Sequence, residues 1–65
     1  MTLFSQLESL LFVSSKPLSV KEMAELSGAK AKEVTEALIK LAEEYKTQQR
    51  GFVLINNNGQ YQLAT

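Results

Sequence analysis

Residues 19–28 read SVKEMAELSG and mark both ends of a short helix. Ser19 and Glu22 form an S-x-x-E capping box, in which each side chain accepts a hydrogen bond from the other residue's backbone N–H. Gly28 follows about two turns later, where a left-handed residue commonly ends a helix. The apolar residues expected to enter the core are Val20, Met23, Ala24 and Leu26. The segment predicts one short helix, with the other elements arranged around it.

A first helix is predicted over residues 3–14, with Thr2 as its N-cap. Its apolar stripe comprises Leu3, Phe4, Leu7, Leu10 and Leu11. Phe12 and Val13 lie off this stripe, so they either pack at the helix end under the following loop or form a second apolar surface for a partner. Residues 14–18 are predicted to be a connector, because Pro17 favours an extended conformation for the residue before it.

A third helix is predicted from Ala31 to Tyr45 or Lys46. Its apolar face comprises Val34, Ala37, Leu38, Leu41, Ala42 and Tyr45. Lys30 occupies the N-cap position, although lysine is a poor cap and its charge opposes the helix dipole.

The hydrophobic period changes from helical to alternating after Gly51. Residues 52–56 predict a strand, residues 57–59 (Asn-Asn-Gly) predict a hairpin turn, and residues 60–64 predict a second strand with Tyr61 and Leu63 facing the core. Three helices followed by a hairpin predict an α+β fold. The expected architecture is a winged helix-turn-helix over residues 1–65, with a three-helix core and a C-terminal β-hairpin wing.

The composition argues against catalysis. The 65 residues contain no Cys and no His, which removes the commonest nucleophile, general base and metal ligands. We therefore expect no enzyme activity, no metal and no cofactor. The longest apolar run, residues 10–13, is too short to span a bilayer, and no signal peptide is evident, so we expect a cytoplasmic protein.

Residues 10–19, LLFVSSKPLS, resemble the opening of bacterial segregation and condensation protein B, in which a Leu-Leu-Phe-Val-Ser run precedes a Pro-Leu-Ser turn. The resemblance continues through residues 23–28, 34–38, 41–45, 50–51 and 61–65. Lys30 departs from the family, which more often has a capping Ser or Asp there. The resemblance covers the first of the family's two winged-helix domains, which implies that this chain is an N-terminal fragment.

The resemblance also implies a function. Proteins of this family are non-enzymatic subunits of the condensin-like complex that acts in chromosome condensation and segregation. Their partners are a kleisin subunit, whose middle segment they bind, and through it an SMC ATPase. Their N-terminal domains are associated with homodimerisation. The resemblance therefore implies a homodimeric, kleisin-binding module in the cytoplasm, associated with the nucleoid.

The alternative for any helix-turn-helix is a transcription regulator whose third helix reads DNA. The seven Lys and Arg residues are balanced by seven Asp and Glu residues, whereas nucleic-acid-binding domains are usually basic. The solvent face of the third helix is itself mixed, with Lys32, Glu33, Glu36, Lys40 and Glu43. Sequence-specific DNA binding is not expected. Four scattered cations are either weak phosphate contacts or solubilising charges: Lys16, Lys30, Lys32 and Arg50.

Surplus apolar residues favour a protein partner. Phe52, Val53, Leu54 and Ile55 are consecutive, although a hairpin packed on one side needs an apolar residue only at alternate positions. Either Val53 and Ile55 or Phe52 and Leu54 should therefore be exposed. The predicted partner or dimer surface comprises Phe12, Val13, Ile39, Val53 and Ile55.

Overall fold

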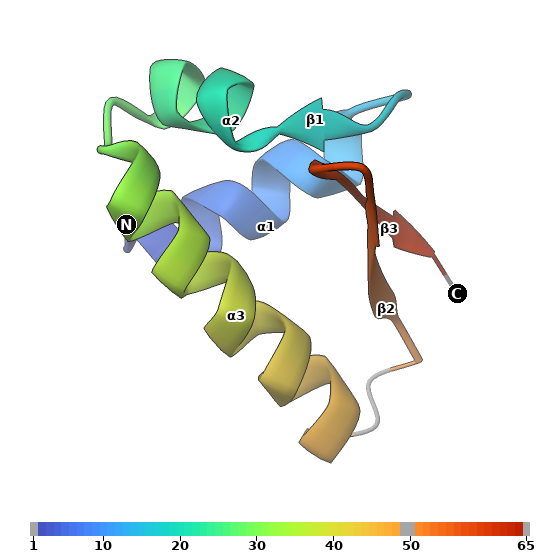
Figure 1. Cartoon of the computed structure of the whole chain (residues 1–65). Coiled ribbons are helices and arrows are strands. Elements are labelled where there is room, and N and C mark those ends of the chain that lie inside the picture. The colour runs from blue at the N-terminus through green and yellow to red at the C-terminus, as the bar shows by residue number, and fades with distance from the viewer. Residues whose placement is uncertain (1, 49–50, 65) are drawn as a thin grey trace.

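The computed structural model describes residues 2–48 and 51–64. The elements follow the order α1 (Leu3–Val13), β1 (Leu18–Ser19), α2 (Val20–Ser27), α3 (Ala31–Gln48), β2 (Val53–Asn57) and β3 (Gln60–Ala64). In Figure 1, α2 and β1 lie at the top, α3 descends in front of α1, and the β2–β3 hairpin lies to the right. The predicted three helices and C-terminal hairpin are confirmed, and no helix within the described ranges combines the length and apolar character needed to cross a membrane.

The predicted caps of α1 and α2 are confirmed. The Thr2 side chain accepts a hydrogen bond from the backbone N–H of Ser5 at 3.2 Å. In the capping box, the Ser19 N–H donates to Glu22 Oε1 at 2.9 Å, and the Glu22 N–H donates to Ser19 Oγ at 3.1 Å. Gly28 ends α2 with a φ of 78°, a conformation that costs glycine little. These local signals determine where α2 begins and ends.

The start of α3 is stabilised without a capping side chain at Lys30. The Lys30 backbone N–H donates to Glu33 Oε1 at 3.1 Å, and the Lys30 carbonyl accepts from Val34 at 3.0 Å. Glu33 thus supplies half of a capping box and places a negative charge in the first turn, where the helix dipole favours it. The helix runs to Gln48, further than predicted.

The sheet has three strands in the order β1-β3-β2, so the prediction of a two-stranded wing was incomplete. The connector contains β1, whose Leu18 and Ser19 pair with Tyr61 and Gln60 of β3. Leu18 is 7% exposed and belongs to the core. A two-residue strand is invisible to a periodicity argument, because alternation needs several residues to be recognised.

The hairpin turn consists of Asn58 and Gly59, with φ angles of 55° and 82°. Asn56 stabilises it, because its Oδ1 accepts from the Gly59 N–H at 3.1 Å and its Nδ2 donates to Tyr61 Oη at 3.3 Å. Strand β2 begins at Val53 and extends to Asn57, one residue later at each end than predicted. The turn chemistry expected of Asn-Gly is confirmed.

The core lies between the three helices and the inner face of the sheet. The buried residues are Leu7, Leu11, Leu18, Met23, Val34, Leu38, Leu41 and Tyr45. Tyr45 also links α3 to α1, because its hydroxyl donates to Glu8 Oε2 at 2.6 Å. The prediction that Leu26 enters the core was wrong, since Leu26 is 63% exposed. It lies off the stripe formed by Val20, Met23 and Ala24, which faces the core.

Candidate interaction surfaces

The polar and charged side chains of the described residues lie at or near the surface. Within residues 2–48 and 51–64, no polar or charged residue is buried, and no cluster of carboxylates could hold a metal ion. The pKa of Glu22 is lowered, first because its carboxylate accepts the backbone N–H of Ser19 and then because it bonds the Ser19 side chain. This shift belongs to the capping box and therefore has a structural cause.

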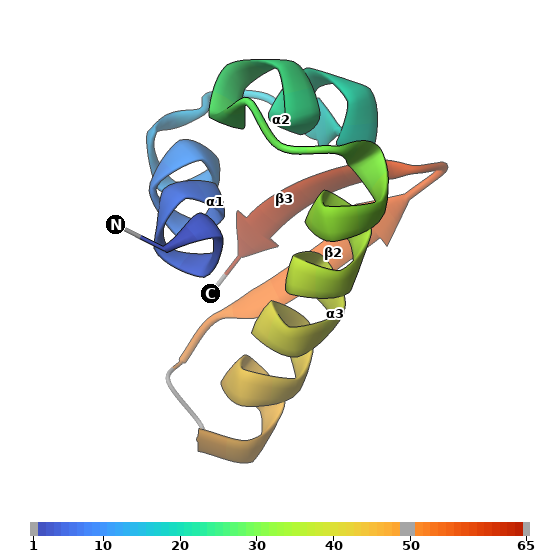
Figure 2. The same ribbon diagram turned by 90° about the vertical axis from the view of Figure 1, so that its left-hand side faces the viewer.

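Strand β2 settles which apolar pair is exposed. Phe52 and Leu54 pack against the core, whereas Val53 and Ile55 are 54% and 39% exposed. In the register of β2 with β3, Val53 lies opposite Ala64 and Ile55 opposite Gln62. Val53 and Ile55 therefore share the outer face of the sheet. In Figure 2 α3 lies in front of the hairpin, and in Figure 1 no helix lies on the side of the hairpin away from α3. We call Val53 and Ile55 the wing face.

Ile39 lies beside β2, on the other side of the strand from the wing face. It is 56% exposed and borders a shallow groove of about 220 Å³ between α3 and β2. The groove is lined by Leu38, Ile39, Ala42, Leu54, Asn56 and Tyr61. Strand β2 is thus flanked by exposed apolar side chains on both of its faces.

Phe12 and Val13 lie on different surfaces, and neither belongs to the wing face. The Phe12 ring packs edge-on against Phe52, with ring centroids 5.0 Å apart, although Phe12 remains 51% exposed. Val13 is 81% exposed and points to a different place, a groove of about 210 Å³ between α1 and α2. Phe12 thus packs against the residue before β2 and not under the loop that follows α1, and a partner surface at Phe12 and Val13 stays a prediction.

The groove that contains Val13 was not predicted as a unit. It is lined by Gln6, Ser9, Leu10, Val13, Leu26 and Ser27, and we call it the α1–α2 groove. Leu26, which the sequence analysis assigned to the core, forms one wall of it. The position of Leu26 off the apolar stripe of α2 was the available signal. That α1 and α2 meet here could not be read from either helix alone.

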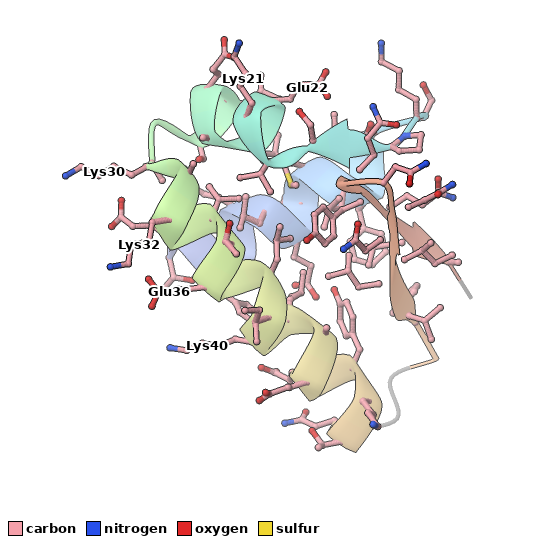
Figure 3. All side chains as sticks on the ribbon, viewed as in Figure 1. Lys21, Glu22, Lys30, Lys32, Glu36 and Lys40 are labelled. Atoms are coloured by element: carbon pink, nitrogen blue, oxygen red, sulfur yellow. The ribbon has the colours of Figure 1, made fainter. Side chains whose placement is uncertain are left out.

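The charged residues are distributed unevenly. Every Lys, Arg, Asp and Glu lies within residues 1–50, and residues 51–64 carry none. On α3, Lys32, Glu36 and Lys40 project away from the sheet and mix both signs, as Figure 3 shows. The predicted mixed face of this helix is exposed, with carboxylates where a DNA-reading helix would meet phosphates.

The predicted phosphate contacts come from different segments of the chain. Lys16 lies before the start of α2, and Lys30 and Lys32 lie beyond its end, so the eight-residue helix separates them. Lys21 and Glu22, labelled in Figure 3, lie at the start of α2. Arg50 lies outside the described residues. Weak phosphate contact by the three described lysines stays a prediction.

Comparisons with known proteins agree with the fold and with the sequence resemblance. Residues 5–65 match the family model described as segregation and condensation complex subunit ScpB. Segregation and condensation protein B of Clostridium tetani is 40% identical over 62 residues, which cover 95% of this chain and 33% of that protein. The corresponding protein of Clostridium acetobutylicum is 41% identical over 61 residues, covering 94% and 30%. The chain thus spans about a third of the length of these curated relatives.

Solved structures show the same architecture. The crystal structure of ScpB from Mycobacterium tuberculosis superposes with a TM-score of 0.90 at 24% identity, covering 97% of this chain and 39% of that one. The crystal structure of a dimer of the ScpB N-terminal domain complexed with an ScpA peptide superposes with a TM-score of 0.87 at 25% identity, covering 95% and 78%. The winged-helix fold is confirmed. The chain belongs to the family of segregation and condensation complex subunit ScpB.

Proposed function

We propose that this chain is a non-enzymatic interaction module of a chromosome condensation and segregation complex, and that it binds both a second copy of itself and a kleisin segment. Family membership supports this role, as does the similarity to a dimer of the ScpB N-terminal domain complexed with an ScpA peptide. The observation that carries the proposal is the presence of separate exposed apolar surfaces on a domain of zero net charge. Such surfaces on a small soluble domain mark protein contacts.

We assign the two partners to two places. The α1–α2 groove is a shallow apolar groove between two helices, lined in part by Leu10 and by the exposed side chains of Val13 and Leu26. A groove of this kind accepts the apolar side chains of a partner helix, so we assign it to the kleisin. The wing face is assigned to the second copy. An SMC ATPase would then be reached through the kleisin, which would place the protein at the nucleoid.

We further propose that this chain is the first of two winged-helix domains of a longer protein. The share of the relatives that it covers supports this arrangement. The other parts of such a protein would add their own contacts to those of this chain.

A binding experiment tests the kleisin assignment. The middle segment of the kleisin is titrated into the 65-residue chain and followed by calorimetry, using wild type, Leu26→Asp and Ile55→Asp. We expect Leu26→Asp to weaken binding by at least about tenfold, because one apolar contact of partial burial is worth about 1.5 kcal/mol. Ile55→Asp, which lies outside the groove, should bind the kleisin segment as wild type does. Equal weakening by both variants would contradict the assignment.

A DNA titration separates this proposal from a role as a transcription regulator. We expect weak binding of duplex DNA, if any is measured, with no preference among sequences. The mixed charge of α3 is the reason. Tight binding whose affinity falls steeply between low and high salt would instead favour the regulator.

A further inference from the structure

The hairpin turn places an asparagine directly before a glycine, a pair whose side chain and backbone can react with each other. Asn58 carries a carboxamide, and Gly59 has no side chain to shield its backbone nitrogen. Attack of such a nitrogen on the carboxamide carbon is one reason why asparagine is a thermolabile residue. Both residues are exposed, so water and hydroxide reach them. The sequence contains no other Asn-Gly pair.

The closed turn holds the reacting atoms apart. Ring closure requires Asn58 Cβ and Gly59 N to lie on the same side of the Cα–C bond of Asn58. The φ angles of 55° and 82° are both positive, as a two-residue type I′ hairpin turn requires. The ψ angle of the first residue in such a turn is about +30°, which places these two atoms on nearly opposite sides of that bond. The ring therefore cannot close until the turn opens.

A hydrogen bond from strand β2 adds to this protection. The Gly59 N–H donates to Asn56 Oδ1 at 3.1 Å, and Asn56 Nδ2 donates to Tyr61 Oη at 3.3 Å. The Gly59 nitrogen becomes nucleophilic only after hydroxide removes its proton, and a proton that is shared with Asn56 is harder to remove. Asn56 thus holds the turn closed and keeps the proton on the attacking nitrogen.

We propose that Asn58 is a deamidation site controlled by the wing: it is protected while the turn is closed and reacts when β2 and β3 separate. Hydroxide takes the proton of the Gly59 N–H, and the nitrogen forms a bond to Asn58 Cγ. The bond from Cγ to the side-chain nitrogen breaks, and that nitrogen takes a proton from water and leaves as ammonia. Water then adds to either carbonyl carbon of the resulting succinimide and opens the ring to aspartate or to isoaspartate.

Each product changes the wing in a defined way. Residues 51–64 contain no charged residue, so either product introduces the first charge of this segment. Aspartate leaves the backbone unchanged, and Asp-Gly suits the same turn. In isoaspartate the backbone runs through the former side chain, which adds one methylene to a connection of two residues. Because loop length fixes the register that pairs Asn57 with Gln60, isoaspartate disrupts the pairing of β2 with β3.

Mass spectrometry of the wild-type chain, kept in mildly alkaline buffer with and without guanidinium chloride, tests the site. Replacement of the side-chain NH2 by OH is read from the mass, and fragmentation assigns it to one residue. We expect Asn58 to be the reacting asparagine in both samples, at a rate at least about tenfold lower in the folded chain, since the reaction follows the population of the open turn. Equal rates would overturn protection by the turn, and reaction at Asn57 as fast as at Asn58 would overturn the site.

Three variants separate the hydrogen bond from the reacting group. Asn56→Ala should accelerate deamidation in the folded chain about fivefold, the change in population that loss of one hydrogen bond brings. Asn57→Ala, one position further along β2, is the matched control and should react as wild type does. Asn58→Gly keeps a turn with two positive φ angles and should abolish the mass change. A folded Asn56→Ala chain that reacts no faster than Asn57→Ala would overturn the role of Asn56.

The effect on the register has its own measurement. The added negative charge lets ion-exchange chromatography isolate the deamidated chains, and fragmentation identifies the isoaspartate form. Asn58→Asp carries the same charge on an unchanged backbone and is its matched control. We expect the isoaspartate form to unfold at a lower temperature than Asn58→Asp. Equal unfolding temperatures would overturn the disruption of the hairpin by isoaspartate.

Discussion

The helical part of the molecule, residues 2–48, and the wing, residues 51–64, differ in two properties. All the buried core residues lie in the helical part, and none of the described wing residues is buried. All the charged side chains of the sequence lie outside the wing as well. The helical part therefore supplies the core that holds the fold together and, apart from Arg50, the charged side chains. The wing closes one side of the core and leaves an uncharged, partly apolar surface that suits a partner.

The largest expected effect is the loss of stability when a core-facing leucine is shortened in the helical part, compared with the same change in the wing. Leu41 is fully buried on α3, so Leu41→Ala should lower the free energy of unfolding of the chain by about 3 kcal/mol because the substitution leaves a cavity. Leu63 is half-buried on β3, so Leu63→Ala should lower the free energy of unfolding by only about 1 kcal/mol. Urea denaturation followed by circular dichroism measures both. Leu26→Ala is the surface control and should stay within about 0.5 kcal/mol. Equal losses at Leu41 and Leu63 would mean that the wing is as much a part of the core as the helices.

The two tyrosines provide a smaller comparison between the same regions. The Tyr45 hydroxyl donates to the Glu8 carboxylate at 2.6 Å in a partly buried position. The Tyr61 hydroxyl accepts from the Asn56 amide at 3.3 Å in an exposed one. We expect Tyr45→Phe to cost about 2 kcal/mol and Tyr61→Phe about 0.5 kcal/mol, because bonds to charged groups contribute more. Denaturant unfolding at one pH checks the difference. A larger loss for Tyr61→Phe would contradict the view that the helical part dominates stability.

The capping box lies where the two regions meet, since Ser19 both caps α2 and pairs with Gln60 of the wing. Ser19→Ala should destabilise the chain by about 1 kcal/mol, the usual cost of removing an N-cap. Ser15→Ala, in the exposed loop before β1, should change stability by less than about 0.5 kcal/mol. Thermal unfolding of the two variants gives the comparison, and a neutral result for Ser19→Ala would show that the cap contributes nothing here.

The smallest expected effect is on the pH dependence of stability in acid. The capping hydrogen bonds lower the pKa of Glu22 in the folded chain below the ordinary value of 4.5. A group with a lowered folded pKa contributes stability that is present above the unfolded value and is lost as pH falls through the folded one. Stability should therefore decline below pH 4.5, and Glu22→Gln should make that decline shallower. Urea midpoints measured at several pH values test this. Identical pH profiles for both proteins would mean that the Glu22 bond does not form in solution.

Local signals in the sequence were sufficient for most of the fold. The Ser19–Glu22 box and the Asn58–Gly59 turn depend on residues close together in the chain, so their geometry follows from neighbouring side chains. Strand β1 depends on pairing with the distant strand β3 and was missed. Leu26 was assigned to the core although its position off the apolar stripe of α2 indicated exposure. The candidate surfaces were predicted residue by residue, and the structure distributes those residues over separate places.

The sequence by itself determined three helices, a hairpin, a chain without cysteine or histidine, and a wing without charge, because composition and short-range periodicity specify these properties. Only the tertiary structure decided that Val53 and Ile55 face outward while Phe52 and Leu54 face the core. In a strand of four consecutive apolar residues, either alternate pair can face the core, because successive side chains point to opposite faces and both pairs are apolar. Packing against α3 and pairing with β3 select one orientation. The same packing brings Val13 and Leu26, from two helices, into one groove.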